Sequence, residues 1–185
     1  MRLKRACTLR DGAVLMLASL RPEDAADVLR VCRQASGETL NLMRYPDEWK
    51  ITDAREAEML RSAEDGPRSL MLGAFLEGKL IGVGSLMPVA NPDRVRHRAG
   101  LGVMVLKAWW HRGVGGAMLR ALIAAAQGAG LEQLELEVVT TNERAIRLYT
   151  RCGFEEYGLL PRAFKYREGG YADLLLMRLA LHSEG

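Results

Sequence analysis

The sequence predicts a mixed α/β fold, of the α+β kind, in which a central mixed β-sheet of about six to seven strands is flanked by about four helices. Short apolar runs typical of strands recur along the 185 residues, and two of them flank Glu77-Gly78 as the arms of a hairpin. Stretches with apolar residues at helical spacing lie between the other runs. This length fits one domain, so we expect residues 1–185 to form a single unit.

The first half of the chain is expected to begin with one strand and two helices. Residues 14–20 form an apolar run typical of a strand. Pro22 suits the first position of a helix, which needs no N–H, and residues at helical spacing follow it. Thr52 is a suitable N-cap for a second, short and charged helix that ends near Ser62. The segment 39–49 is irregular and aromatic and receives no assignment. The apolar positions of the first helix are Ala25, Val28, Leu29 and Cys32.

Three strands and the most regular helix of the chain are expected next. Residues 70–76 and 79–87 form the hairpin, and residues 98–106 return as a strand after a loop around Asn91-Pro92-Asp93. Residues 113–127 carry one apolar stripe at helical spacing, which Gly128 and Gly130 end. The stripe consists of Val114, Ala117, Met118, Ala121, Leu122 and Ala125.

The last third is expected to add a strand, a helix and a second hairpin. In the strand at 131–139, Leu134, Leu136 and Val138 face one way and Glu135 and Glu137 face the other. Residues 142–152 follow a helical pattern that Gly153 ends. Residues 154–165 and 171–181 then pair around a glycine-rich turn.

Charge and cysteine content argue against several classes of protein. The net charge of +3 suits an anionic small ligand, and the densest basic run, at 94–98, lacks the interleaved aromatic residues of a nucleic-acid site. No apolar run approaches the ~18 residues of a membrane span. Arg10 and Asp11 interrupt the N-terminal run, so no signal peptide is expected. The three cysteines form no C-x-x-C pair, so no metal is expected and the reducing cytoplasm is the expected location.

The most informative stretch is a buried strand that runs into a glycine-rich turn. Residues 103–106 lead to His111-Arg112-Gly113-Val114-Gly115-Gly116-Ala117, which opens the long helix. Free N–H groups at a helix start, with the helix dipole, make a site for a pyrophosphate. The plain alternative is a tight turn with close packing of helix on strand. A P-loop would need Lys and Ser or Thr after Gly115, and a dinucleotide fingerprint would need a third glycine at Met118.

Two motifs carry a resemblance to the GNAT N-acetyltransferase superfamily. Trp110-His111-Arg112-Gly113-Val114-Gly115 resembles its coenzyme A turn, Q/R-x-x-G-x-G/A, with Trp110 in place of Gln or Arg. Leu136-Glu137-Val138, Asn142 to Tyr149 and Cys152-Gly153-Phe154 resemble its second block, in the family's order and spacing. The resemblance covers roughly residues 70–181. Residues 96–105 and 162–177 are also similar to a bacterial subgroup of mostly unassigned substrates.

The resemblance implies the GNAT fold and acetyl-CoA as co-substrate. It also implies direct transfer of the acetyl group to a primary amine, which needs orientation, an acid and a base more than covalent catalysis. Backbone at Met104 and Val105 is implied to pair with the pantetheine arm, and Tyr149 resembles the general acid. The remaining residues implied to bind the coenzyme are Arg112, Gly113, Val114, Gly115, Gly116, Ala117, Asn142 and Ala145.

The general base is not fixed by the resemblance. The subgroup often carries Glu before Leu101, but here Gly100 stands at that position. Glu137 is the replacement candidate, because its offset from Tyr149 matches a base–acid spacing in ribosomal-protein alanine acetyltransferases. The alternative to a catalytic role for Glu137 is that of an exposed strand residue, and the alternative for Tyr149 is that of a residue packed in the core. His97 and His111 are weaker candidates for the base, since a solitary loop histidine is usually solvated.

The acceptor stays open between a small-molecule amine and an amine of a protein or peptide. Residues 39–49 and 162–171 are expected to shape its pocket. Two other functions compete with the enzyme: a non-catalytic acyl-CoA-binding or sensing module, which Gly100 and Trp110 allow, and a dinucleotide oxidoreductase, which Met118 disfavours. Neither a nucleic-acid nor a membrane partner is expected, and the oligomeric state stays open, a homodimer included.

Overall fold

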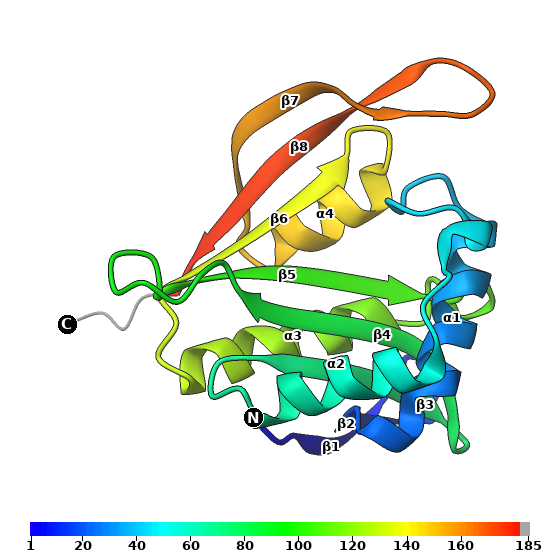
Figure 1. The fold of residues 1–185 in the computed structure, drawn as a ribbon, viewed down its shortest axis with the longest axis vertical. Coiled ribbons are helices and arrows are strands. Elements are labelled where there is room, and N and C mark those ends of the chain that lie inside the picture. The colour runs from blue at the N-terminus through cyan, green and yellow to red at the C-terminus, as the bar shows by residue number, and fades with distance from the viewer. Residues whose placement is uncertain (182–185) are drawn as a thin grey trace.

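The computed structural model describes residues 1–181 and contains one eight-stranded mixed sheet (Figure 1). The strands lie in the order β1-β2-β3-β4-β5-β6-β8-β7, and every neighbouring pair is antiparallel except β5 and β6. Their bounds are β1 Lys4–Thr8, β2 Val14–Ser19, β3 Leu70–Leu76, β4 Lys79–Pro88, β5 Arg98–Val105, β6 Gln133–Val139, β7 Glu155–Lys165 and β8 Tyr171–Ala180.

Four α-helices cover the two faces of the sheet and build two cores. α1 (Ala25–Glu38) and α2 (Asp53–Asp65) bury Val28, Val31 and Leu60 against one face. α3 (Val114–Gly128) and α4 (Glu143–Arg151) bury Met118, Leu122 and Tyr149 on the other. The expected mixed sheet with flanking helices is therefore confirmed.

Parallel strands β5 and β6 pair over only three positions and then diverge. Arg98, Ala99 and Gly100 lie opposite Gln133, Leu134 and Glu135, and no pairing between the two strands follows in the described residues. In Figure 1 the two strands leave this point in different directions, with β5 continuing beside β4 and β6 beside β8. The centre of the sheet is therefore open along more than half of β5.

The peptide groups that face this gap follow from the pairing of β5 with β4. The Leu106 N–H donates to the Ile81 carbonyl at 3.0 Å, and the Arg98 carbonyl accepts from Val89 N–H at 3.1 Å. Because peptide groups alternate in direction along a strand, even-numbered residues of β5 bond to β4. The N–H and C=O groups of the odd-numbered Val103 and Val105 therefore point into the gap, where they need other partners.

A bidentate ion pair holds the strands together where they still touch. Arg98 donates two hydrogen bonds to Glu135, one from Nη2 to Oε2 at 2.8 Å, and Gln133 donates another to Glu135 Oε1 at 2.7 Å. The Arg98 guanidinium, above all through its hydrogen bonds, holds the pKa of Glu135 below its ordinary range. These contacts fix the point from which β5 and β6 separate.

Two features of the fold differ from the sequence-based expectation. The structure has one strand more than the upper expectation, because β1 pairs with β2 along the sheet edge. Its residues are mostly exposed and include Lys4 and Arg5, so no alternating apolar pattern marks them. The helix expected at Pro22 begins as a short 3₁₀ turn, and α1 proper runs from Ala25 to Glu38. The hairpin at Glu77-Gly78 is confirmed, with both residues at positive φ.

Candidate active site

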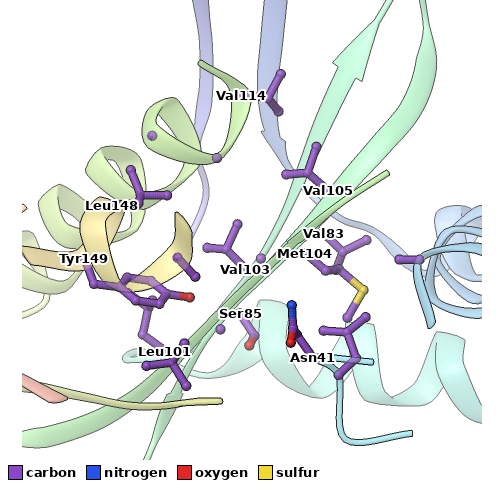
Figure 2. A pocket seen from close by; sticks show the side chains of 18 of the residues that line it. Asn41, Val83, Ser85, Leu101, Val103, Met104, Val105, Val114, Leu148 and Tyr149 are labelled. Carbon is purple, nitrogen blue, oxygen red and sulfur yellow. The ribbon is translucent and has the colours of Figure 1, made fainter. Parts of the chain in front are cut away.

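A cavity of about 1310 Å³ passes through the gap between β5 and β6 and opens on both faces of the sheet. On one side it is lined by the start of α3 and by α4, and on the other by α1, α2 and the segment 39–49. Figure 2 shows Leu148 and Tyr149 on one side of β5 and Met104 and Asn41 on the other. Two ligands approaching from opposite faces could therefore meet within the sheet.

The glycine turn presents unpaired N–H groups to one end of this cavity. Gly113 is the N-cap of α3 with φ 98°, a left-handed conformation that favours glycine. The first helical hydrogen bond runs from the Ala117 N–H to the Gly113 carbonyl at 3.0 Å. The N–H groups of Val114, Gly115 and Gly116 precede that bond and have no partner within residues 1–181, so they are available to a ligand. Ala117 lines the cavity, but its N–H is used within the helix, contrary to the expectation that it binds phosphate.

Basic side chains surround this end of the cavity. Together with the positive end of the α3 dipole, they favour an anionic ligand such as a pyrophosphate. Arg112 is fixed by an ion pair with Asp11 and lies 4.6 Å from the centroid of the Trp109 ring. The basic residues that line this end are Arg10, His111, Arg112, Arg120, Arg144, Arg147 and Arg151.

Trp110 lines the cavity beside the end of β5 and was not expected to have a role. Its Nε1 donates to the Val105 carbonyl at 2.7 Å, so this gap-facing acceptor is occupied while the Val105 N–H stays free. The Arg144 guanidinium, from α4, lies 3.6 Å from the centroid of the Trp110 ring. Burial lowers the pKa of Arg144 from its ordinary value. The indole thus links the end of β5 to the helix that follows β6.

The peptide groups of Met104 point in the opposite direction from those of its neighbours on β5. Its peptide groups bond toward β4, and its side chain packs with the cluster beneath α1 and α2. The peptide groups at the open edge of β5 are therefore those of Val103, whereas those of Met104, which was expected to pair with the pantetheine arm, already bond to β4. Sequence alternation could have shown this once the pairing of β5 with β4 was known.

Asn142 caps α4 at the cavity wall. Its Oδ1 accepts a hydrogen bond from the Ala145 N–H at 3.3 Å, which uses the Ala145 amide within the cap. The side-chain NH₂ group of Asn142 has no protein partner in the described residues. Asn142 and Ala145 both line the cavity, Asn142 with a donor and Ala145 with a methyl group.

Tyr149 combines core packing with a hydroxyl at the cavity. The residue is 8% exposed, and its ring centroid lies 5.8 Å from that of Phe154. Figure 2 shows the hydroxyl directed into the cavity, toward the strand that carries Val103. Burial raises the pKa of Tyr149 to about 12, with Arg144 opposing the shift. The phenol therefore stays protonated near neutral pH and can donate a proton.

Glu137 lies on the opposite face of β6 from the buried Leu136 and Val138, as the alternation predicted. It lines the same cavity as Tyr149 and an adjoining cavity of about 390 Å³. The empty side-chain position of Gly100 faces the same side, and a Cβ there would meet only the Met87 carbonyl at 3.8 Å. His111 lines the cavity at its basic end, whereas His97 does not line it.

Comparison with known proteins identifies the family. A family model described as the acetyltransferase (GNAT) family matches residues 36–154. The L-amino acid N-acetyltransferase AaaT of Escherichia coli (strain K12) is 31% identical over 114 residues, which are 61% of this chain and 69% of that protein. The chain belongs to the GNAT family of acetyltransferases. The protein is therefore an acetyltransferase, as its two motifs predicted.

Solved structures share the fold over about nine-tenths of the chain. An acetyltransferase of the GNAT family from Streptococcus pneumoniae has a TM-score of 0.86 at 29% identity, covering 90% of this chain and 99% of that one. A protein of Salmonella typhimurium, solved with its cofactor acetyl-CoA, shares the fold with a TM-score of 0.81 at 19% identity, covering 92% and 96%. No helix within residues 1–181 of this GNAT chain has the length and apolar content to span a bilayer.

Residues 39–49 and 162–171 are the two segments that enclose the side of the GNAT sheet opposite α3. The turn between β7 and β8 reaches η2 (Pro46–Glu48), where Arg167 forms two hydrogen bonds with Asp47 at 2.8 and 3.0 Å. The Arg167 N–H also donates to the Tyr45 hydroxyl at 2.9 Å. Residues within 39–45 and 163–166 line the smaller cavity beside Glu137, so the role of segments 39–49 and 162–171 in shaping an acceptor pocket stays a prediction that this placement supports.

Gly115→Val tests the glycine turn without requiring a left-handed residue. A Cβ at Gly115 lies 3.5 Å from Leu148 Cδ2, an ordinary contact, so the fold should survive while the added methyl groups narrow the cavity between α3 and α4. We expect calorimetric affinity for coenzyme A to fall at least about tenfold, because the backbone no longer approaches the ligand closely. Gly128→Ala, at the far end of α3 and in open space, is the matched control. Equal affinity of the two folded variants would refute a phosphate site at this turn.

Proposed function

We propose that the protein transfers the acetyl group of acetyl-CoA to a primary amine by direct attack of the neutral amine on the thioester carbonyl. The observation that carries this proposal is the cavity through the gap between β5 and β6. It joins a basic, N–H-rich end to an end with free carboxylates. The acetyl donor would occupy the first end and the amine the second.

The residues at the basic end fit the donor. The N–H groups of Val114, Gly115 and Gly116 and the surrounding arginines would hold the pyrophosphate. The gap-facing groups of Val103 and the N–H of Val105 would hydrogen-bond the pantetheine arm as a missing strand would. The acetyl group would then lie between β5 and β6, within reach of both faces of the sheet.

Proton transfer is assigned to one residue on each face. The amine nitrogen forms a bond to the carbonyl carbon, and the carbon–sulfur bond breaks. Glu137 takes the proton that the amine loses, directly or through a water, and Tyr149 gives a proton to the departing thiolate. The amine proton and the thiolate proton thus balance, and each group returns to its starting state by exchange with solvent.

The acceptor is proposed to be a small amine. The Escherichia coli relative is named for acetylating L-amino acids. The contacts of Arg167 with η2 enclose the acceptor side, which suits a small molecule better than a folded protein surface. A panel of amines assayed for thioester loss tests the activity, and coenzyme binding without turnover of any amine would leave a non-catalytic acyl-CoA-binding module.

Tyr149→Phe removes only the hydroxyl and keeps the ring packed against Phe154. If the hydroxyl protonates the thiolate, kcat should fall about 10²–10⁴-fold while the affinity for acetyl-CoA holds. Because burial raises the pKa of Tyr149 to about 12, the wild-type rate should show no loss from phenol ionisation up to about pH 10. A variant with the wild-type rate would reduce Tyr149 to core packing.

Glu137→Gln tests the base. The amide keeps size and hydrogen bonding but cannot take the proton, so kcat/KM should fall across the whole pH–rate profile. Stability should hold because Glu137 is exposed. Glu132→Gln, which changes an exposed residue just before β6, is the matched control. If the profiles of Glu137→Gln and wild type on one amine coincide in shape and height, another group is the base.

A further inference from the structure

One buried carboxylate at the acceptor end has no part in the proton transfers. Glu56, on α2, is only 5% exposed, yet it lines the cavity. Within residues 1–181, no hydrogen bond or ion pair reaches its carboxylate. Every fully buried side-chain oxygen in the described residues has a hydrogen-bond partner, whereas the Glu56 oxygens have none. The Glu56 oxygens are therefore not fully buried, and the surface that they retain opens on the cavity.

The protein supplies little compensation for this charge. Desolvation raises the pKa of Glu56, and Arg44 opposes the shift. The Arg44 guanidinium lies 4.7 Å from the centroid of the Trp49 ring and forms no ion pair with Glu56. The facing Cys32 thiol, with its pKa raised to about 12 by burial, is neutral. An uncompensated carboxylate in an apolar wall is costly, unless a ligand brings the missing cation.

The lining around Glu56 suggests the shape of that ligand. Apolar side chains of three methionines and a leucine share the acceptor side of the cavity with Glu56 and Glu137, and suit the methylene stem of a flexible cation. The opposite end, by contrast, is lined by basic groups, which repel a cation. The apolar residues are Leu42, Met43, Met59 and Met71.

We propose that Glu56 binds a second cationic group of the acceptor, so that the preferred substrates are alkyl diamines or amino compounds with a cationic tail. This inference rests on the proposed acetyl transfer to an amine. One nitrogen, deprotonated, attacks the thioester carbonyl between Glu137 and Tyr149, while the other stays an ammonium and forms a charge-assisted hydrogen bond with Glu56.

Three amines of equal length separate this role from its rivals: 1,5-diaminopentane, pentylamine and 5-aminopentanoate. Wild type should prefer the diamine to pentylamine by about tenfold or more in kcat/KM, as expected for one charge-assisted hydrogen bond. Glu56→Gln should bring that ratio close to one. Glu58→Gln, which alters an exposed carboxylate on the same helix, should retain it. A ratio that Glu56→Gln leaves unchanged, or a wild-type preference for 5-aminopentanoate through Arg44, would overturn the inference.

Thermal unfolding gives a readout that does not depend on turnover. 1,5-Diaminopentane should raise the Tm of wild type but not of Glu56→Gln. The pKa of Glu56 in the folded protein is raised above its ordinary 4.5. The contribution of this carboxyl to the free energy of unfolding is therefore present below pH 4.5 and is lost as the pH rises through the folded pKa. Glu56→Gln should therefore raise Tm at pH 7 and not at pH 4. Equal shifts of both proteins by the diamine would contradict the inference.

The two proposals fail in different ways. Loss of thioester with other amines but no preference for the diamine would keep the acetyltransferase proposal and reject the role of Glu56. No turnover of any amine, with a Glu56-dependent Tm shift by the diamine, would reject the transfer to amines and keep the cation site.

Discussion

The early separation of β5 and β6 is the constraint on which the rest of the site depends. Three paired positions, braced by Arg98 and Glu135, hold the strands together, and the sheet then opens. In the described residues, the opening leaves both peptide groups of Val103 and the N–H of Val105 unpaired in the middle of a sheet, where burial without partners would be costly. A ligand with amide groups would remove this cost, which is why we propose the gap between β5 and β6 as the binding site.

The sheet divides the chemistry between its two faces. On the α3 and α4 face, free N–H groups and arginines attract an anion, and Tyr149 keeps its proton through burial. On the α1 and α2 face, Glu137 and Glu56 provide negative charge. Because the gap joins the faces, the proposed anionic donor and cationic acceptor would be drawn to opposite ends of one cavity and would meet between β5 and β6.

Local patterns predicted most of the fold and most of the residues that line the basic end of the cavity. The glycine turn, the alternation that turns Glu137 away from the core and the block ending at Tyr149 depend on neighbouring residues, which a sequence displays. The sequence could not show that the open-edge peptide groups are those of Val103 and not Met104, because peptide direction depends on pairing with β4. It also could not show β1, because that strand lacks an apolar pattern. The environments of Trp110 and Glu56 depend on residues distant in the chain. Arg144 lies over the Trp110 ring, and Glu56 lies in the wall of the cavity, so both environments became visible only in the folded structure.

The central claim is that the donor completes the open edge of β5, and amide hydrogen exchange tests it residue by residue. On addition of coenzyme A, the amides of Val103 and Val105 should become protected from exchange, because they face the gap. The amide of Met104 already bonds to β4 and should change little. Saturation with coenzyme A that leaves Val103 and Val105 exchanging as before would contradict the account.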